Sequence, residues 1–586
     1  MLVCSGRSTS NPDQKTCIMK KIVLLFLFIL FGLNETVFAS HFFGSEISYL
    51  QLSPNTYQAT LKIYRDCTGT GVTAPVNIQL NAPGCNSGRL VPLALVSTRI
   101  NKPYGALVPV SCTSTSTFPN YQILTYSGQF TFSAAEAACS DWVLSWAECC
   151  RPVTANLVGQ DNLYTEANLK LIAGVVNSSP VFDTLHAPAL LAYYNLVHNL
   201  SMAAIDPDGD SLVYKLDAPL ANANTPVPYK PYLQQAASIP GLSPNIIINP
   251  NPRPPYSVSP FNPQVALITG SPVPAVFNPQ FPMPSIVVDW NGPPTIPYPS
   301  APNGLIWEAR QLFELNAVNG ELRFSPSRYV AGASAASGEN KYTVTITVEE
   351  YRKINGVMTK LGFVRRETMI EVTGYHNGIP YITSSVANNQ SIQPDHEIKL
   401  RPGTPLALHF SGTDPDNQTV DLTTNATYIL PGSSFVASPG SGPVGSITWV
   451  PTAADVRWQP YFIQVMFRDD ASILRGVHIE TFAIRVSHTG SVTNTPEAFR
   501  EETFVAYPNP FSEQLHFKLN LHTKAESLKI YNLLGQQIDE IKLQHSGLGE
   551  QHLQWKNAGK YAAGTYVAKL ISQDKKVQIL KFTKLQ

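Results

Sequence analysis

Forty-eight prolines and thirty-six glycines interrupt this chain of 586 residues, and their frequency limits its secondary structure more than any other feature. Proline breaks helices, and both residues favour turns. With 44% hydrophobic residues the chain can still bury cores, so short strands joined by turns are the remaining arrangement. We therefore predict an all-β protein of tandem β-sandwich modules, each roughly 100–200 residues long.

Charged residues are few and balanced. They make up 14% of the chain, and Lys+Arg and Asp+Glu number 41 each. A chain without excess positive charge has no global field that attracts nucleic acid. We therefore expect no nucleic-acid partner.

The N-terminal residues 1–40 have the pattern of a leader. Two lysines after Met19 precede an apolar run over residues 22–31, and small residues end at Ala39 and Ser40. This order is typical of a secretory signal peptide, and the run is too short to span a bilayer. The sequence predicts Met19 as the start, and the general secretion machinery as a partner.

Six of the eight cysteines lie within 84 residues of the predicted domain 41–190: Cys67, Cys85, Cys112, Cys139, Cys149 and Cys150. An even, clustered set in an exported domain predicts disulfides. A zinc site is the alternative, but the segment lacks a Cys-x-x-Cys pair and a histidine pair at ligand spacing. Neighbouring side chains on a strand point to opposite faces, so we expect Cys149 and Cys150 not to pair with each other. The remaining pairings stay open.

Three stretches of this disulfide-rich β domain carry a resemblance. They are His41-Phe42-Phe43-Gly44-Ser45-Glu46-Ile47-Ser48-Tyr49, Tyr64-Arg65-Asp66-Cys67 and Cys149-Cys150-Arg151. The segment resembles a family of surface proteins from gliding bacteria, although the family often has glycine at position 45 and asparagine at 152. The resemblance implies a cell-surface protein and carries no known active site.

Residues 191–375 and 376–490 follow one plan. Each opens with an acidic turn and later has a Gly-x-x-x-aromatic-x-Pro stretch, at 320–326 and 445–451. Such a diverged repeat resembles immunoglobulin-like or cadherin-like modules. Alternating apolar residues predict strands over 57–63, 342–348, 461–467 and 481–486. Residues 221–300 hold 20 prolines and three charged residues, so we expect no regular sheet or helix there. The segment is either a long insertion wrapped on the module or an exposed extended segment.

Asp206, Asp208 and Asp210 place three carboxylates at alternate positions, as in the opening of calcium loops. Ser211 stands where a helix–loop–helix calcium site needs glycine, and a strand pattern follows it. Two interpretations stay open: a cadherin-like calcium site, or an Asx-type turn whose aspartates cap the backbone. The turn at Asp414 and Asp416 is less suited to calcium, because Gln418 takes the third position.

Composition changes after residue 490, so we predict a linker over 491–505 and a small β-sandwich over 506–586. Residues 511–586 contain no proline and eleven lysines. Its signature residues are Tyr507, Pro508, Asn509, Pro510, Phe511, Gly535, Gly564 and Tyr566. In this order they resemble the C-terminal sorting domain of the type IX secretion system. The resemblance implies export by the type IX translocon, removal of the domain by a surface sortase, and linkage of the protein to a lipopolysaccharide anchor.

The sequence therefore predicts a secreted or cell-surface binding or adhesion protein with a glycan or protein ligand. We expect contacts through the aromatic-rich residues 41–150 or the proline-rich residues 221–300. The chain lacks the Gly-x-Ser-x-Gly, His-Glu-x-x-His and phosphate-loop motifs. The alternative is a secreted hydrolase of glycans or peptides that brings carboxylates together from distant segments. The adjacent Glu349 and Glu350 do not predict such a pair, because their side chains point apart on a strand.

Overall fold

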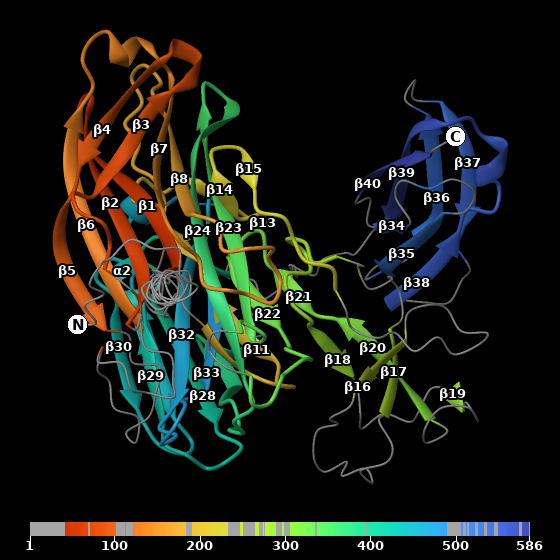
Figure 1. Ribbon diagram of the computed structural model, residues 1–586. Coiled ribbons are helices and arrows are strands. Elements are labelled where there is room, and N and C mark those ends of the chain that lie inside the picture. The colour runs from red at the N-terminus through yellow and green to blue at the C-terminus, as the bar shows by residue number, and fades with distance from the viewer. Residues whose placement is uncertain are drawn as a thin grey trace, which may run out of the picture. The chain divides into compact units, whose positions relative to one another are not determined.

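The structure is a computed structural model of the chain (Figure 1). It describes residues 42–67, 69, 71–100, 112, 121–182, 190–232, 246–249, 264–268, 274, 276–288, 296–297, 305–333, 337–392, 397–488, 505–507, 511, 515–521, 525–532, 536–543, 549–572 and 577–584. The predicted leader and most of the linker 491–505 lie outside these residues. Among the described residues, no helix is long and apolar enough to cross a membrane.

The chain divides into two compact units, which are described separately. The first extends to Pro380 and includes Asp414–Gln418 and Arg468–His478, and the second contains the rest. The described part is almost entirely β, as predicted. Its short helical turns are η1 (Pro83–Cys85), η2 (Glu136–Ala138), α2 (Ala426–Ile429), η3 (Ala453–Asp455) and η4 (Ala558–Lys560).

A sheet of 14 strands dominates the first unit. Its strands are β1 (Phe42–Ser53), β2 (Thr56–Asp66), β3 (Asn77–Ala82), β4 (Ser87–Pro92), β5 (Ala94–Ile100), β6 (Tyr121–Thr131), β7 (Asp141–Glu148), β8 (Leu163–Lys170), β10 (Leu190–Tyr193), β13 (Ser211–Asp217), β14 (Leu220–Asn222), β15 (Thr225–Pro226), β23 (Lys341–Ile354) and β24 (Val357–Thr373). The main path runs β4-β3-β7-β8-β24-β1-β2-β6-β5.

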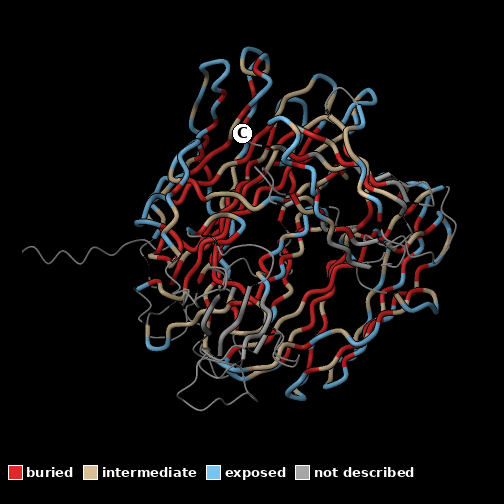
Figure 2. Tube along the Cα trace, turned by 90° about the vertical axis from the view of Figure 1, so that its right-hand side faces the viewer, coloured by how far each residue is buried: buried red, intermediate tan, exposed pale blue. Residues whose placement is uncertain are grey.

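The two ends of this path pack against each other. In β2 the buried residues alternate from Tyr57 to Ile63, as the sequence predicts. Tyr57 stacks on Phe130 of β6, and Phe132, just after β6, lies 4.8 Å from Trp142 of β7 between ring centroids. These aromatic side chains fill the core of a sandwich. Figure 2 shows buried residues along the strands and exposed residues around the turns.

Strand β24 joins distant parts of the sequence. Ser45 of β1 pairs with Glu367, and Leu169 of β8 pairs with Gly362. Strand β23, which contains the predicted strand 342–348, pairs with β13 and β24, and its residues 341–350 are buried on both faces of the sheet. The segments 41–190 and 191–375, predicted as separate domains, share one sheet and one hydrophobic core.

Smaller sheets complete the first unit. Their strands are β9 (Val181–Phe182) with β12 (Ala204–Ile205); β11 (His198–Ser201), β21 (Phe313–Leu315) and β22 (Glu321–Phe324); and β16 (Ile246–Asn249), β17 (Gln264–Ile268), β18 (Ile286–Val288), β19 (Ile296–Pro297) and β20 (Leu305–Gln311).

The prediction that residues 221–300 contain no regular sheet is wrong, because β15 to β19 lie within them. β16, β17 and β18 occupy short proline-free stretches, where every residue keeps its N–H donor. Pro297 lies in β19, which pairs with β20 alone, as expected for proline in a sheet.

The second unit contains a sandwich of two sheets. Its strands are β25 (Tyr381–Ala387), β26 (Gln390–Ser391), β28 (Leu406–Thr413), β30 (Ser434–Ser438) and β31 (Val444–Trp449) in one sheet, and β27 (Glu397–Leu400), β29 (Val420–Thr424), β32 (Tyr461–Asp469) and β33 (Val477–Val486) in the other. Phe410, Ile463 and Phe482 lie in the core between them. The strands predicted over 461–467 and 481–486 fall within β32 and β33.

The C-terminal residues form another small sandwich. Its sheets contain β34 (Val505–Tyr507), β35 (His516–Leu521) and β38 (Gly549–Gln554), and β36 (Ala525–Asn532), β37 (Gln537–Lys542), β39 (Gly564–Ser572) and β40 (Val577–Lys584). Phe511, Phe517, Trp555 and Phe582 pack in its core. The small β-sandwich predicted over 506–586 is therefore confirmed.

Candidate functional site

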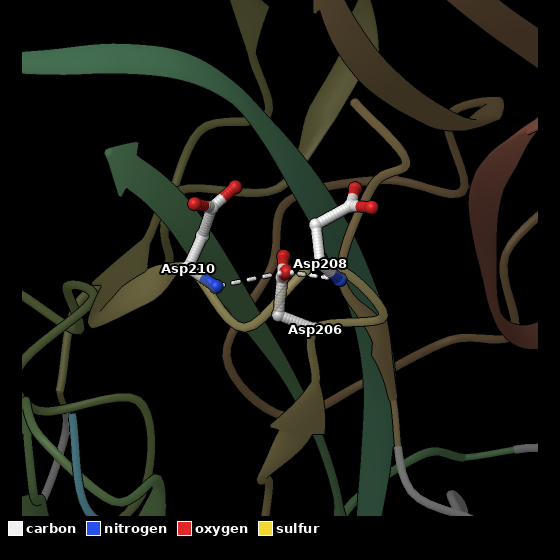
Figure 3. A group of neighbouring side chains, drawn as sticks. All are labelled: Asp206, Asp208 and Asp210. Atoms are coloured by element: carbon white, nitrogen blue, oxygen red, sulfur yellow. Dashed lines mark hydrogen bonds between the residues drawn. The ribbon is translucent and has the colours of Figure 1, made fainter. Parts of the chain in front are cut away.

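The acidic turn at 206–210 connects β12 to β13 in the first unit. The Asp206 Oδ1 atom accepts the backbone N–H groups of Asp208 at 2.9 Å and Asp210 at 3.0 Å, as Figure 3 shows. These are the hydrogen bonds of the Asx-type turn that the sequence predicts as one interpretation. The three carboxylates also offer one oxygen each within 4.8 Å of one another. The turn thus caps its own backbone and gathers three acidic groups.

Glu350 of β23 completes the cluster, and sequence analysis did not assign it to this site. Antiparallel pairing places Glu350 opposite Leu212, two residues after Asp210. Its Oε1 atom accepts hydrogen bonds from the Asn177 Nδ2 at 2.7 Å and the Tyr49 hydroxyl at 3.3 Å. The side chain is fully buried. A negative group is thus brought from a strand 140 residues away to the turn.

Glu349 and Glu350 point apart, as the sequence predicts. The Glu349 carboxylate pairs with Lys215 and with Lys360, the latter at 2.7 Å. Glu350 lies near Asp206 instead, close enough that the charge of Asp206 acts on its pKa. The opposite directions of Glu349 and Glu350 could be predicted from the sequence, because neighbouring side chains on a strand point to opposite faces. The sequence did not show which face would meet the acidic turn.

Burial and like charge raise the pKa values of this cluster. Burial, followed by the neighbouring Asp210 and Asp208 charges, raises the pKa of Asp206 to about 6. Burial, with the nearby Asp206 and Asp210 charges, raises the pKa of Glu350 well above its ordinary value. Both effects disfavour the ionised form. The site therefore favours a proton or a cation between these groups.

Arg352 is the cation that the chain itself provides. Its Nε and Nη2 atoms donate to the two carboxylate oxygens of Asp210 at 2.6 and 2.8 Å. It lies farther from Asp208, at 3.8 Å, whose Oδ2 atom accepts the Ser178 N–H at 2.6 Å. The bidentate geometry fixes Asp210. Asp206 and Glu350 receive no ion pair from it.

The second acidic turn repeats the geometry of the first. The Asp414 Oδ1 atom accepts the N–H groups of Asp416 at 2.8 Å and Gln418 at 3.1 Å. Asp469 also contributes a carboxyl group at this turn. Burial, together with the nearby Asp414 charge, raises the pKa of Asp469 to about 6. Asn377 donates to Asp469 at 2.7 Å. The repeat is therefore present in three dimensions as two similar capped turns.

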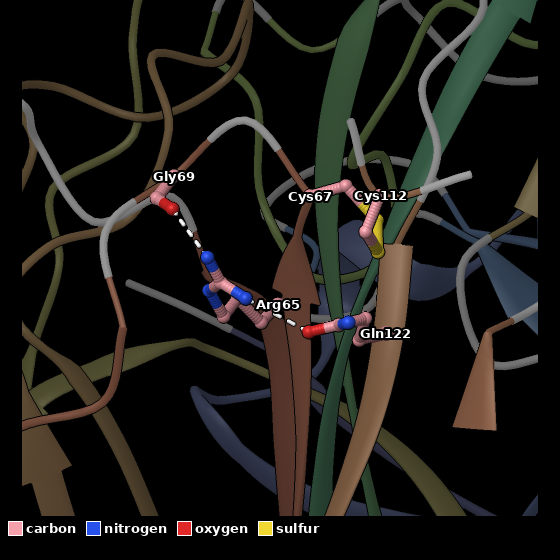
Figure 4. Close-up of a disulfide and its surroundings, with 5 residues drawn as sticks. All are labelled: Arg65, Cys67, Gly69, Cys112 and Gln122. Atoms are coloured by element: carbon pink, nitrogen blue, oxygen red, sulfur yellow. Dashed lines mark hydrogen bonds between the residues drawn. A yellow bond between two sulfur atoms is a disulfide. The ribbon is translucent and has the colours of Figure 1, made fainter. Parts of the chain in front are cut away.

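The predicted disulfides are present, with one difference. Cys67 pairs with Cys112, as Figure 4 shows, and Cys85 pairs with Cys139. The expectation that Cys149 and Cys150 do not pair is wrong, because the structure joins them to each other. That expectation assumed that both lie on a strand, but β7 ends at Glu148. The rule of opposite faces therefore does not apply to them.

The residues of the N-terminal resemblance form a buried ionic network. Glu46 of β1 accepts from Lys62 at 2.8 Å, from the Tyr64 hydroxyl at 2.6 Å, and from Arg366 of β24 at 2.5 Å. Arg151 makes a two-point ion pair with Glu367, at 2.5 and 2.7 Å. Both pairs are almost fully buried.

Arg65 of the same resemblance lies next to the Cys67–Cys112 disulfide. It donates to the Gly69 carbonyl at 2.6 Å and to the Gln122 side chain at 2.8 Å (Figure 4). These contacts connect the strands and turns around the disulfide. The resemblance therefore marks residues that hold the domain together.

The aromatic residues of 41–150 are mostly interior. Tyr57, Phe130, Phe132 and Trp142 all lie in the core of the first unit. They do not form the contact surface that the sequence suggested as one candidate. The other candidate, 221–300, lies mainly outside the described residues.

The C-terminal signature residues lie in the last sandwich where they are described. Phe511 and Tyr566 are buried in its core, and Gly564 begins β39. The backbone of Tyr507 ends β34. Pro508, Asn509, Pro510 and Gly535 lie outside the described residues.

Comparison with known families identifies the family of the C-terminal sandwich. Residues 505–583 match the family described as "Secretion system C-terminal sorting domain". The protein therefore belongs to the class of exported proteins that reach the cell surface or the extracellular space. Its C-terminal domain is that of a type IX secretion cargo, as the sequence resemblance implies. No curated protein matches the chain.

Solved structures match the chain only at low identity and low TM-score. An I-band fragment of titin is 9% identical, covers 76% of this chain and 99% of its own, and has a TM-score of 0.13. The sialic acid binding region of a Streptococcus sanguinis adhesin is 11% identical, with coverages of 53% and 78% and a TM-score of 0.14. A Ca²⁺-stabilized adhesin of an Antarctic bacterium is 7% identical, with coverages of 90% and 94% and a TM-score of 0.13.

Proposed function

We propose that this protein is a binding or adhesion protein of the bacterial surface, exported by the type IX secretion system. The observation that carries the proposal is the C-terminal sorting domain, which follows disulfide-bonded β-sandwich modules. Sorting domains deliver the rest of the chain to the outside. Disulfides stabilise exported domains in an oxidising environment.

Trp458 is the residue we assign to ligand contact in the second module. Its side chain is 81% exposed, although an indole is among the largest apolar groups that a protein can bury. Exposed aromatic side chains stack on sugar rings and fill pockets of protein partners, and tryptophan is enriched where binding energy concentrates. The ligand class we propose is a surface glycan.

The backbone around Trp458 is firmly held. Arg485 donates to the Trp458 carbonyl and makes a two-point ion pair with Glu397, at 2.6 and 2.8 Å. The Arg457 guanidinium stacks on the Tyr461 ring at 3.5 Å. A rigid loop loses little entropy when its side chain binds a ligand. An exposed indole on such a loop is suited to recognition.

The acidic site is unsuited to glycoside hydrolysis. Hydrolysis of a glycoside needs two carboxyl groups that reach the substrate, separated by roughly 5 Å or more. Glu350 is fully buried and lies against Asp206. A substrate therefore has no access to this pair.

Binding to a panel of surface polysaccharides tests the proposal. We expect Trp458→Ala to lower glycan binding by about tenfold or more, as for a central aromatic contact, without lowering the unfolding midpoint. Tyr381→Ala is the matched control, because Tyr381 is also an exposed aromatic residue, at 49%. Equal binding by wild type and Trp458→Ala would exclude Trp458 as the contact. Hydrolysis of the glycans by the wild type would support the hydrolase instead.

A further inference from the structure

Two buried carboxylate oxygens in the acidic site face no hydrogen-bond donor. They are the Asp206 Oδ2 and Glu350 Oε2 atoms, which no amide, hydroxyl or cationic group of the described residues reaches; the two carboxyl groups lie close enough to hydrogen-bond to each other only when one of them holds a proton. The other oxygen of each group is fixed, since Asp206 Oδ1 caps two backbone N–H groups and Glu350 Oε1 accepts from Asn177 and Tyr49. Neither carboxylate can turn its free oxygen away without losing these bonds. Leaving such an acceptor buried and unsatisfied is costly.

Charge in the cluster is not balanced by the chain. Three carboxylates gather at the turn, Glu350 lies close enough to feel the charges of Asp206 and Asp210, and Arg352 engages mainly Asp210. Lys215 and Lys360 pair with Glu349, which points away from the cluster. The free oxygens of Asp206 and Glu350 therefore need a positive partner from outside the chain.

We propose that a calcium ion binds here, held by Asp206 Oδ2, Glu350 Oε2 and the Asp208 carboxylate. All three ligands are hard oxygen donors, which calcium prefers over the nitrogen and sulfur ligands of zinc. Asp208 is exposed, whereas Asp206 is half-buried and Glu350 fully buried. The ion reaches the site from the solvent side and keeps water on that face, because calcium takes 6–8 oxygen ligands.

The ion links side chains from segments that are far apart in the sequence. Asp206 and Asp208 belong to the turn before β13, and Glu350 lies near the end of the long strand β23. The backbone N–H of Ser178 holds Asp208 at 2.6 Å from a third segment. Calcium therefore stabilises this end of the first unit. This role does not depend on the ligand of Trp458.

The test measures the thermal unfolding midpoint of the full disulfide-bonded chain in EDTA and in about 5 mM calcium, above the dissociation constants typical of extracellular modules. Calcium raises the midpoint of the wild type, and magnesium raises it less because magnesium dehydrates reluctantly. Glu350→Gln is almost the same size and keeps an oxygen acceptor, but it loses the negative charge. We expect this variant to bind calcium at least about tenfold more weakly, and to unfold at a higher temperature than the wild type in EDTA.

Glu349→Gln is the matched control on the same strand. It removes the same charge one residue away, but its side chain faces Lys215 and Lys360. We expect it to keep the full calcium response. A wild-type midpoint that calcium does not change overturns the proposal and indicates that the two carboxyl groups share a proton. An equal loss of the response in Glu349→Gln and Glu350→Gln overturns it as well.

Discussion

Buried charges hold the first strand of the described chain in place. Glu46 contacts Lys62, Tyr64 and Arg366, and all but Lys62 are almost fully buried. Burial alone would raise the pKa of Glu46, but the charges of Arg366 and Lys62 lower it to about 2. The carboxylate therefore stays ionised across the physiological range. Glu46 and Arg366 both lose water on burial, and the charge of each offsets the desolvation cost of the other.

Replacement of Glu46 by glutamine leaves the buried Arg366 without its counter-charge. We expect Glu46→Gln to lower the free energy of unfolding by about 3–5 kcal/mol, measured by urea denaturation. Glu136→Gln is the control, because its partner Arg89 is 37% exposed, and such surface pairs contribute less than about 1 kcal/mol. Similar losses in both variants would show that the buried network has no special role.

The raised pKa of Asp206 predicts a pH dependence in the absence of calcium. The groups facing it are Asp208, Asp210, Glu350 and the Arg352 guanidinium, with Tyr49 and Asn177 behind Glu350. A carboxyl whose pKa is about 6 in the folded state holds its proton more tightly there than when unfolded. Stability therefore falls as the pH rises from about 4 through 6.

The variant Asp206→Asn removes this titration and offers an amide donor to Glu350. In EDTA, we expect its free energy of unfolding to exceed that of the wild type at pH 7 by on the order of 2 kcal/mol, with little difference at pH 4. Urea denaturation at both values measures the change. If the difference in free energy of unfolding between the variant and the wild type were the same at pH 4 and pH 7, the assignment of the raised pKa to Asp206 would be contradicted.

At the scale of elements, β1 occupies the middle of the large sheet. It lies between β2 and β24, and its partner in β24 is more than 300 residues away. The backbones come so close at Gly44 that a Cβ atom there would overlap the Glu367 carbonyl oxygen. Gly44 also belongs to the stretch that carries the family resemblance. The contact explains why glycine stands at this position.

The variant Gly44→Ala tests this close approach. We expect a loss of about 3 kcal/mol or more in the free energy of unfolding, because the backbone of β1 or β24 must shift. Gly84→Ala is the control, since a Cβ atom at Gly84 meets no atom within 4 Å. Denaturation midpoints of the two variants give the comparison. A tolerated alanine at position 44 would show that the pairing of β1 with β24 is looser than described.

The Cys67–Cys112 disulfide closes a long loop next to β2 and β6. The cysteines are 45 residues apart, and a crosslink over such a loop stabilises by roughly 4 kcal/mol through the unfolded state. We expect Cys67→Ala/Cys112→Ala to lose stability of this order, measured by urea denaturation under oxidising conditions. An unchanged midpoint would show that the loop is ordered without its crosslink.

Local patterns predicted the strands, but not their partners. Alternation over 57–63 and 461–467 identified β2 and β32, because each strand buries one face. The sharing of one sheet by residues 41–190 and 191–375 depends on pairs such as Ser45 with Glu367. No local pattern specifies a contact over that distance. Glu350 was missed at the acidic site for the same reason.

The C-terminal domain directs the export and sorting of the whole protein. The domain has its own core around Trp555 and Phe582. Its family match covers 505–583. We expect a chain lacking residues 506–586 to keep its sandwich modules folded and to stop in the periplasm.

The most direct test is to locate the mature protein in its native host and to determine its two termini. Mass spectrometry of surface-shaved cells and of culture medium provides both. We expect a chain outside the outer membrane that starts near His41 and lacks the residues after about 505. A chain retained inside the cell with residues 507–586 intact would contradict it, because the C-terminal sandwich would then be a working module instead of a sorting domain.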